Sequence, residues 1–226
     1  MLLTHTLLFW IGACWGSWLT CMAERLSANQ SLWRQPRSAC PVCHHQLRAW
    51  QLIPLVGAAV QGWRCHDCHQ PISWYSTLLE ALCGWLLMIS WHAPNQIPLL
   101  MLGAYAVLLF NSLTDYLTFD VYPSTLLLPG GLGLLWHPLT LNAAFLSLIG
   151  LLVGLSLCAL FTNRFGLGDV DVLLMLSTLA PPAVVIESLL LATLAALLII
   201  VSRRTPGPLP FVPFITWGFI LCTLAP

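Results

Sequence analysis

Long apolar runs fill most of this chain, and their length limits what it can fold into. A helix needs about 20 apolar residues to cross the hydrocarbon core of a membrane, and several runs here approach or reach that length. The runs lack the alternation of apolar and polar residues that membrane β-strands show. We therefore predict an all-α polytopic membrane protein with about eight transmembrane helices. The predicted spans are Leu2–Met22, Trp74–His92, Ile97–Thr114, Val121–Leu139, Leu141–Phe161, Leu167–Ala180, Ala183–Ser202 and, approximately, Pro210–Leu224.

Composition supports a position in the lipid bilayer. Charged residues make up 7% of the chain and hydrophobic residues 58%, whereas soluble domains carry about 25% charged residues. The formal net charge is zero, so no overall basic field favours nucleic acid. We expect a multi-pass membrane protein with no nucleic-acid partner.

The arginines orient the spans. With eight spans, every basic residue falls on one side of the membrane, which the positive-inside rule assigns to the cytoplasm. Pro181-Pro182 must then separate two spans, because otherwise Arg164 and Arg203 would lie on opposite sides. Both termini are expected on the outer side, and no internal repeat is apparent. The basic residues are Arg25, Arg34, Arg37, Arg48, Arg64, Arg164, Arg203 and Arg204.

The polar loop between the first two spans contains two C-x2-C pairs. Cys40 and Cys43 are separated by 21 residues from Cys65 and Cys68, a pattern typical of a four-thiolate zinc site. A loop this short has little core of its own, so a bound metal would stabilise it. The alternatives are two disulfides or free thiols, and the predicted cytosolic position disfavours disulfides.

Acidic residues at the ends of two spans are candidates for catalysis. Asp115 ends the third predicted span and Asp169 opens the sixth, and the arginine topology places both near the cytoplasmic face. Two neighbouring carboxylates share a proton and can activate water against a peptide bond, as in aspartic proteolysis. Gly166 and Gly168 would let backbone or substrate pass close to Asp169.

Structural roles for these acids are also open. Asp169 can cap the start of a helix and Asp115 can be a solvated acid at the interface. Asp171 should face away from Asp169, because the two lie about 200° apart around a helix. Glu80 lies deeper in the second span and needs a partner, either an arginine or a backbone group.

Taken together, these motifs resemble the bacterial type IV prepilin peptidases, membrane aspartic proteases of the GxGD type. The resemblance covers nearly the whole chain in order. It rests on Gly16-Ser17-Trp18-Leu19 with Arg25-Leu26, the two cysteine pairs around Ile53-Pro54, Gln70-Pro71-Ile72-Ser73, Glu80, Gly166-Leu167-Gly168-Asp169 and Pro210-Phe211-Val212-Pro213-Phe214.

The resemblance implies roles for particular residues. Asp115 and Asp169 match the two catalytic aspartates, and Cys40, Cys43, Cys65 and Cys68 match the zinc ligands. Such enzymes remove the positively charged leader from prepilins or pseudopilins at the cytoplasmic face of the bacterial inner membrane. Many also N-methylate the new terminus with S-adenosylmethionine. Asp120 and Asp171 are candidates for weak electrostatic recognition of the positively charged leader.

The chain departs from the family pattern at three places. The proline segment Tyr122-Pro123-Ser124 lies one residue further after Asp115 than in the family pattern. Asp120 therefore stays an alternative to Asp115 as the first catalytic aspartate. Asp171 stands where the family usually has lysine. The cysteine loop has no glycine-rich nucleotide-binding pattern, so methyl transfer rests on the resemblance alone. These departures also suggest a competence-type member.

We therefore expect three regions, with a first transmembrane helix at 1–25, a zinc-binding domain at 26–73 and a seven-helix membrane protease domain at 74–226. A methyltransferase whose active domain is the loop is a second enzyme hypothesis. A zinc-stabilised membrane scaffold or transporter without proteolytic activity is the non-catalytic alternative.

Overall fold

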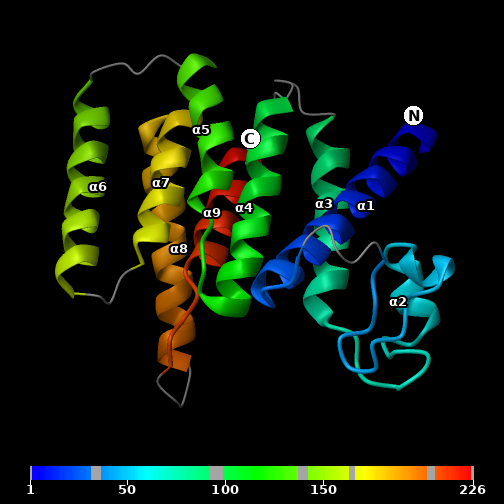
Figure 1. Cartoon of the computed structure of the whole chain (residues 1–226). Helices are drawn as coiled ribbons and strands as arrows, with labels where there is room; N and C mark the ends of the chain where they lie inside the picture. Colours follow the sequence, from blue (N-terminus) through cyan, green and yellow to red (C-terminus); the bar gives the residue numbers. More distant parts are fainter. Residues whose placement is uncertain are drawn as a thin grey trace. The chain divides into compact units, whose positions relative to one another are not determined.

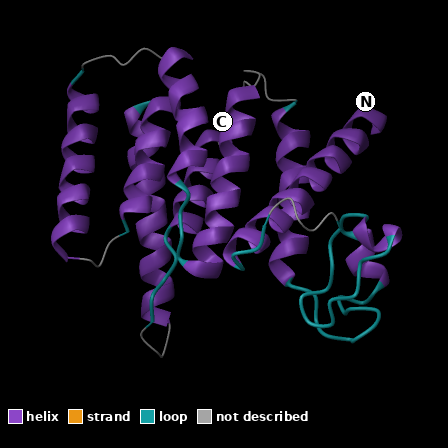
Figure 2. Cartoon of the chain, viewed as in Figure 1, coloured by secondary structure: helices purple, strands orange, loops and turns teal. Residues whose placement is uncertain are grey.

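The computed structural model describes residues 2–31, 37–91, 99–136, 142–162, 166–202 and 207–224. Within these ranges the regular structure is helical, apart from two isolated β-bridges in the cysteine loop (Figures 1 and 2). The helices are α1 (Leu2–Ser27), a 3-10 turn (Ala49–Leu52), α2 (Val56–Val60), α3 (Trp74–Ser90), α4 (Leu99–Thr118), α5 (Pro123–Trp136), α6 (Ala143–Thr162), α7 (Leu167–Leu179), α8 (Pro182–Ser202) and α9 (Val212–Leu224).

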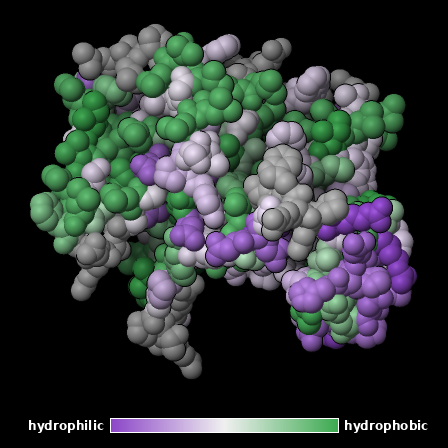
Figure 3. Space-filling view, viewed as in Figure 1, coloured by the Kyte–Doolittle hydropathy of each residue, from purple (hydrophilic) through white to green (hydrophobic). Residues whose placement is uncertain are grey.

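Each of the eight predicted spans falls on one of these helices, which confirms the all-α fold class. Four helices are long and apolar enough to cross a membrane: Leu2–Ser27, Leu99–Thr118, Ala143–Phe161 and Pro182–Ser202. Trp74–Ser90 and Val212–Leu224 are shorter apolar helices. Large apolar side chains such as Phe161 and Leu198 are 83% and 72% exposed, a surface that lipid rather than water would cover (Figure 3). The protein is therefore a multi-pass membrane protein.

The chain divides into two compact units, Met1–Pro98 and Leu99–Pro226. In the first, α1 packs against α3, and the cysteine loop lies between them in sequence. In the second, α5 packs on α7, and α9 packs on both α4 and α8. The division into three regions at 1–25, 26–73 and 74–226 remains a prediction.

Glycines set the contact between α1 and α3. A Cβ atom on Gly12 would collide with the backbone carbonyl of Cys83, and one on Gly16 would lie 2.7 Å from the carbonyl oxygen of Leu79. The G-x-x-x-G spacing places both on one face of α1, where the missing side chains let the two backbones approach.

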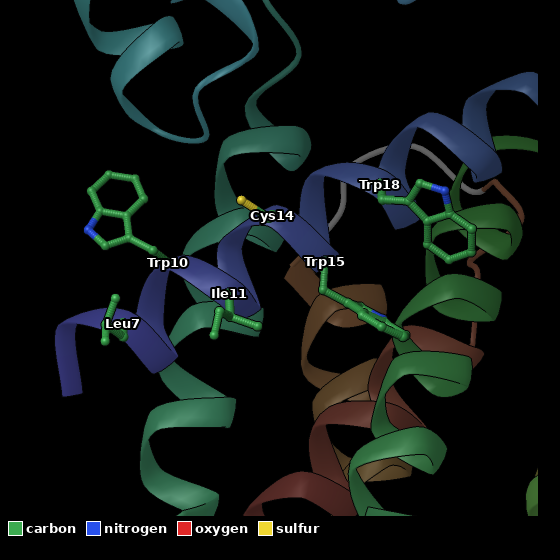
Figure 4. A pocket seen from close by; sticks show the side chains of 6 residues that line it. All are labelled: Leu7, Trp10, Ile11, Cys14, Trp15 and Trp18. Carbon is green, nitrogen blue, oxygen red and sulfur yellow. The ribbon is translucent and has the colours of Figure 1, made fainter. Parts of the chain in front are cut away.

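A different face of α1 carries exposed aromatic and apolar side chains. The indoles of Trp15 and Trp18 meet edge to face with their ring centroids 5.9 Å apart. Together with four neighbours they line a shallow apolar pocket on this helix (Figure 4). Tryptophan is common where a helix meets the membrane interface, so this face suits contact with lipid. The six lining residues are Leu7, Trp10, Ile11, Cys14, Trp15 and Trp18.

In the second unit successive helices run in opposite directions (Figure 1). The end of α4 and the starts of α7 and α9 consequently lie at the same end of this unit. Polar contacts fasten α4 to the antiparallel α9: the hydroxyls of Tyr105 and Thr223 are 2.7 Å apart, and Thr216 donates to the carbonyl of Leu108 at 3.4 Å. Arg34, Arg164, Arg203 and Arg204, on which the predicted topology partly rests, lie outside the described residues.

The α1–α3 contact can be tested by adding one methyl group. Gly12→Ala places a Cβ against the Cys83 carbonyl, so we expect a loss of about 1–3 kcal/mol of stability, measured by thermal unfolding in detergent. Gly103→Ala is the matched control, because a Cβ on this α4 glycine meets nothing within 4 Å. Equal melting temperatures for the two variants would contradict close packing at Gly12.

Candidate active site

Asp115 lies in the last turns of α4 and is only 6% exposed. The backbone N–H of Val212 donates to its Oδ2 at 3.0 Å, and the backbone N–H of Phe211 also bonds to this carboxylate. The Phe211 carbonyl accepts from Ile215 in the first turn of α9, so Phe211 is the N-cap residue. An apolar side chain cannot cap a helix. Asp115 therefore caps α9 from another helix.

Asp169 lies in the first turn of α7 and is 9% exposed. Its backbone N–H donates to the Gly166 carbonyl at 3.2 Å, and its carboxylate accepts from the Gly166 backbone N–H. A carboxylate that reaches back to the N-cap N–H is one half of a capping box. The capping role considered from the sequence for Asp169 is thus observed. Asp115, considered there as a solvated acid, is instead buried and caps α9.

The fold brings these two carboxylates together. The charge of Asp115 acts directly on Asp169, although the two residues are far apart in the sequence. Both are buried at the same end of the second unit. Asp169 belongs to the first turn of α7, and Asp115, near the end of α4, contacts the start of α9. Two carboxyl groups in such a setting cannot easily both ionise and titrate as a pair. Two buried carboxyl groups that interact electrostatically are the groups that acid–base activation of a water molecule requires.

The glycines before Asp169 have separate roles. A Cβ on Gly168 would lie 2.6 Å from the Cβ of Val121, so this glycine lets the start of α7 reach the segment that links α4 and α5. A Cβ on Gly166 would lie 3.1 Å from Oδ2 of Asp169, so the missing side chain keeps that oxygen accessible.

The other two acids near the site lie outside the buried pair. Asp120 is exposed in the linker after α4, although its charge reaches Asp115. Asp171 is partly exposed on α7. The buried geometry favours Asp115 over Asp120 as the partner of Asp169.

Sequence reasoning missed Asn111, which is fully buried one turn before Asp115. Its amide nitrogen donates to the Thr125 hydroxyl at 2.8 Å and to the Val107 carbonyl at 2.9 Å. Its Oδ1 accepts the backbone N–H of Tyr122 at 2.8 Å. Asn111 therefore fastens the linker after α4 beside the aspartates. The sequence does place this amide side chain within an apolar run, which could have indicated a structural role. A polar group that is buried in such a run needs hydrogen-bond partners.

The four predicted metal ligands form one cluster in the first unit. Their sulfur atoms all lie within 4.8 Å of one another, with Cys40 Sγ 3.8 Å from Cys68 Sγ and Cys43 Sγ 3.9 Å from Cys65 Sγ. Tetrahedral ligands at 2.3 Å from a zinc ion would stand about 3.8 Å apart. None of the four forms a disulfide, and the spacing of their sulfur atoms suits a bound metal ion. The disulfide alternative is not what this structure contains.

The two cysteine pairs are a local structural repeat that sequence inspection missed. The N–H of His44 donates to the Cys40 carbonyl and that of His69 to the Cys65 carbonyl, both at 2.9 Å. Both histidines have a φ of 57°. The shared C-x2-C-H pattern was the available signal. The repeat gives each pair the same turn, which aims its two sulfurs at a common point.

The thiols of Cys65 and Cys43 differ in how readily they ionise. Backbone N–H groups of Cys68 and Asp67 lower the pKa of the Cys65 thiol to about 7. At Cys43 the His45 N–H acts in the same direction, but burial and the other sulfurs prevail and raise the pKa to about 12. A bound dication would allow all four sulfurs to be thiolates.

Glu80 has a structural role in the first unit. It is 7% exposed and accepts the backbone N–H of Leu55 at 2.7 Å and a bond from the Ser17 side chain. The predicted backbone partner is therefore the one observed. Glu80 fastens the cysteine loop to α3 and α1.

Comparison with known proteins places this chain in a family. Its residues 10–93 match the family model described as Bacterial Peptidase A24 N-terminal domain. A curated relative from Stutzerimonas stutzeri, named prepilin leader peptidase/N-methyltransferase, is 30% identical over 208 residues, which cover 80% of this chain and 68% of the relative. The chain belongs to the prepilin leader peptidase/N-methyltransferase family. The resemblance stated from the motifs is confirmed.

Two further relatives of the same name agree with this assignment. The protein from Burkholderia pseudomallei strain 1026b is 30% identical over 88% of this chain and 70% of its own length. The protein from Pseudomonas aeruginosa is 30% identical over 80% of this chain and 68% of its own length. No solved structure matches the chain. Family membership does not favour the scaffold or transporter alternative.

The role of Asn111 can be tested by substitution. Asn111→Leu leaves the Tyr122 N–H without its partner, so we expect a loss of about 1–3 kcal/mol and faster hydrogen exchange at residues 119–124. Asn142→Leu is the control, because Asn142 Oδ1 accepts the Phe145 N–H at the start of α6, away from the linker at 119–124. Unchanged exchange at 119–124 in Asn111→Leu would show that this contact does not hold the linker.

Proposed function

We propose that this protein is a membrane aspartic endopeptidase that removes the leader peptide of type IV prepilins or pseudopilins at the cytoplasmic face of the bacterial inner membrane. The observation that carries the proposal is the buried pair Asp115 and Asp169, which lies at one end of the second unit. The names of the relatives, prepilin leader peptidase/N-methyltransferase, supply the substrate class.

The pair can perform hydrolysis with water alone. One carboxylate is ionised and takes a proton from the water molecule that attacks the peptide carbonyl. The other carboxyl group is protonated, polarises that carbonyl and assists departure of the amine. Burial of both groups favours this state with one shared proton, because two adjacent negative charges in a poorly solvated site repel each other.

The position of the pair suits a substrate that is itself a membrane segment. The hydrophobic helix of a prepilin would lie in the bilayer beside the enzyme, so only the short junction with the leader must unwind. The exposed carboxylate of Asp120 can then attract the basic leader. Asp171 is a second candidate for this contact.

The catalytic assignment predicts the effect of single isosteric changes. Asp115→Asn and Asp169→Asn should each lower leader cleavage by at least about 1,000-fold, because neither can then share a proton with its partner. Cleavage is read by mass spectrometry of a co-expressed prepilin, with enzyme amounts matched by immunoblot.

Two further variants make this experiment specific. Glu187→Gln is the matched control, since this exposed acid belongs to α8 and lies outside the site. Asp120→Asn should retain cleavage and raise KM at most. Abolished cleavage in Asp120→Asn together with normal cleavage in Asp115→Asn would transfer the first catalytic role to Asp120.

We further propose that the cysteine cluster holds a structural zinc ion. The sulfur spacing supports zinc, and none of the flanking histidines belongs to the cluster of described residues. Replacing Cys40 or Cys65 with serine should remove about one zinc per chain and make the loop sensitive to protease, because the metal stabilises its fold. Cys158→Ser, in α6, is the control. Unaltered metal content in Cys40→Ser and Cys65→Ser would refute the site.

Methylation of the new N-terminus with S-adenosylmethionine is the second activity that the relatives' names suggest for this chain. S-adenosylmethionine would supply the methyl group when bound, and we assign no residue to it. The same mass spectra of the cleaved prepilin read this activity directly. A product without the added methyl mass would limit the protein to proteolysis, and a methylated but uncleaved substrate would favour the methyltransferase hypothesis.

A further inference from the structure

The two carboxylates of the buried pair have unequal hydrogen-bond environments. Asp115 accepts two backbone N–H groups, from Phe211 and Val212, at the start of a helix that lacks a cap of its own. Among the described residues, Asp169 accepts one backbone N–H, from Gly166, at the start of its own helix. Backbone N–H groups stabilise a carboxylate more than a neutral carboxyl group. The partner with two such donors is the better place for the negative charge.

We propose that Asp115 is the ionised base of the pair and that Asp169 carries the shared proton. This assignment rests on the proposed proteolytic function and adds the role of each aspartate. Phe211 and Val212 are thereby positioning residues, because they act on substrate only through Asp115. The segment Pro210–Phe214 then positions the base, because its backbone donates two N–H groups to Asp115.

The proton and bond changes balance with these roles. Asp115 takes a proton from water as the water oxygen bonds to the peptide carbonyl carbon, and Asp169 gives its proton to the carbonyl oxygen. When the carbon–nitrogen bond breaks, the amine nitrogen takes the proton from Asp115. One hydroxyl of the new acid returns its proton to Asp169, so the pair ends as it began.

Within the part of the chain that the structure describes, few charged groups surround the pair. Asp169 faces Asp115 from α7, and Asp120 acts on Asp115 from the linker after α4. Asp171 follows on α7. The helices α5 and α9 carry no charged side chain. The charge of Asp120 disfavours a negative charge on Asp115, but each of the two backbone donors to Asp115 acts more strongly in the opposite direction. Among the described residues these donors are therefore the main feature that favours the charge on Asp115.

The roles predict which limb of the pH–rate profile each donor controls. The acidic limb of kcat/KM reports the first ionisation of the pair, and the alkaline limb reports the second. A donor to the base stabilises the product of the first ionisation. A donor to the proton carrier stabilises only the doubly charged state. Loss of the Val212 N–H, which donates to the base Asp115, therefore moves the acidic limb to higher pH. Loss of the Gly166 N–H, which donates to the proton carrier Asp169, moves the alkaline limb to higher pH.

Proline substitution removes each N–H with little change to the backbone. Val212 is the first residue of α9, where proline is well tolerated. Gly166 has a φ of −74°, which proline adopts. Each proline variant has an alanine partner, Val212→Ala or Gly166→Ala, that alters the side chain and keeps the N–H. Profiles are measured on the full-length enzyme in lipid vesicles with a purified prepilin.

We expect Val212→Pro to move the acidic limb up by about one to two pH units and to leave the alkaline limb in place. Gly166→Pro should move the alkaline limb up and leave the acidic limb in place. Val212→Ala should leave both limbs in place, whatever its rate. Because a Cβ on Gly166 lies 3.1 Å from Asp169 Oδ2, Gly166→Ala measures the effect of that methyl group alone, and Gly166→Pro should move the alkaline limb further than Gly166→Ala does. The opposite pattern, or unmoved limbs in both proline variants, would overturn the assignment.

A second chemical change covers the case in which a proline variant is too unstable to assay. Replacing Val212 by its α-hydroxy acid turns the amide into an ester, which keeps the side chain and removes the same N–H. Its acidic limb should move as in Val212→Pro, and an unmoved limb would overturn the assignment. Failure of the proposed protease function is distinct, because Asp115→Asn and Asp169→Asn would then still cleave the prepilin.

Discussion

The hydrogen bond from the Val212 backbone to Asp115 links the structural and the catalytic features of the second unit. It caps a helix whose own N-cap residue is apolar, fixes the antiparallel packing of α4 and α9, and gives a buried carboxylate a partner. A buried charge without partners would be strongly unfavourable. One contact therefore satisfies both the start of the helix and the buried acid.

Each unit holds like-charged groups close together, and the two units stabilise these groups in different ways. In the second unit, backbone N–H groups at helix starts hold two carboxylates that would otherwise repel each other. In the first unit, two matching turns aim four sulfur atoms at one point, where a metal ion can neutralise them. In both, like-charged groups from distant parts of the chain are brought together by backbone geometry. Glu80 serves the first unit in a related way, since it ties the cysteine loop to two helices.

Much of the fold followed from local sequence rules. Apolar runs predicted the four described helices that are long and apolar enough to cross a membrane, because a helix is the only way for a single segment to satisfy its backbone in lipid. The C-x2-C spacing predicted the cysteine cluster, since the ligands of each pair are neighbours in the chain. Asn111 and the repeated turn at His44 and His69 were missed, although a buried amide and a shared C-x2-C-H pattern were visible.

The sequence by itself determined the membrane class and the clustering of the four cysteines, and it predicted Asp115 and Asp169 as the acids to test. Each of these inferences depends on residue types and spacings within short segments. Only the tertiary structure decided that Asp115 rather than Asp120 is buried beside Asp169, and that the backbone of Phe211 and Val212 serves Asp115. Those facts depend on how α4, α7 and α9 pack, and packing joins residues whose separation in the chain carries no local signal. Backbone N–H groups leave no trace in the residue type, so no reading of side chains alone reveals them.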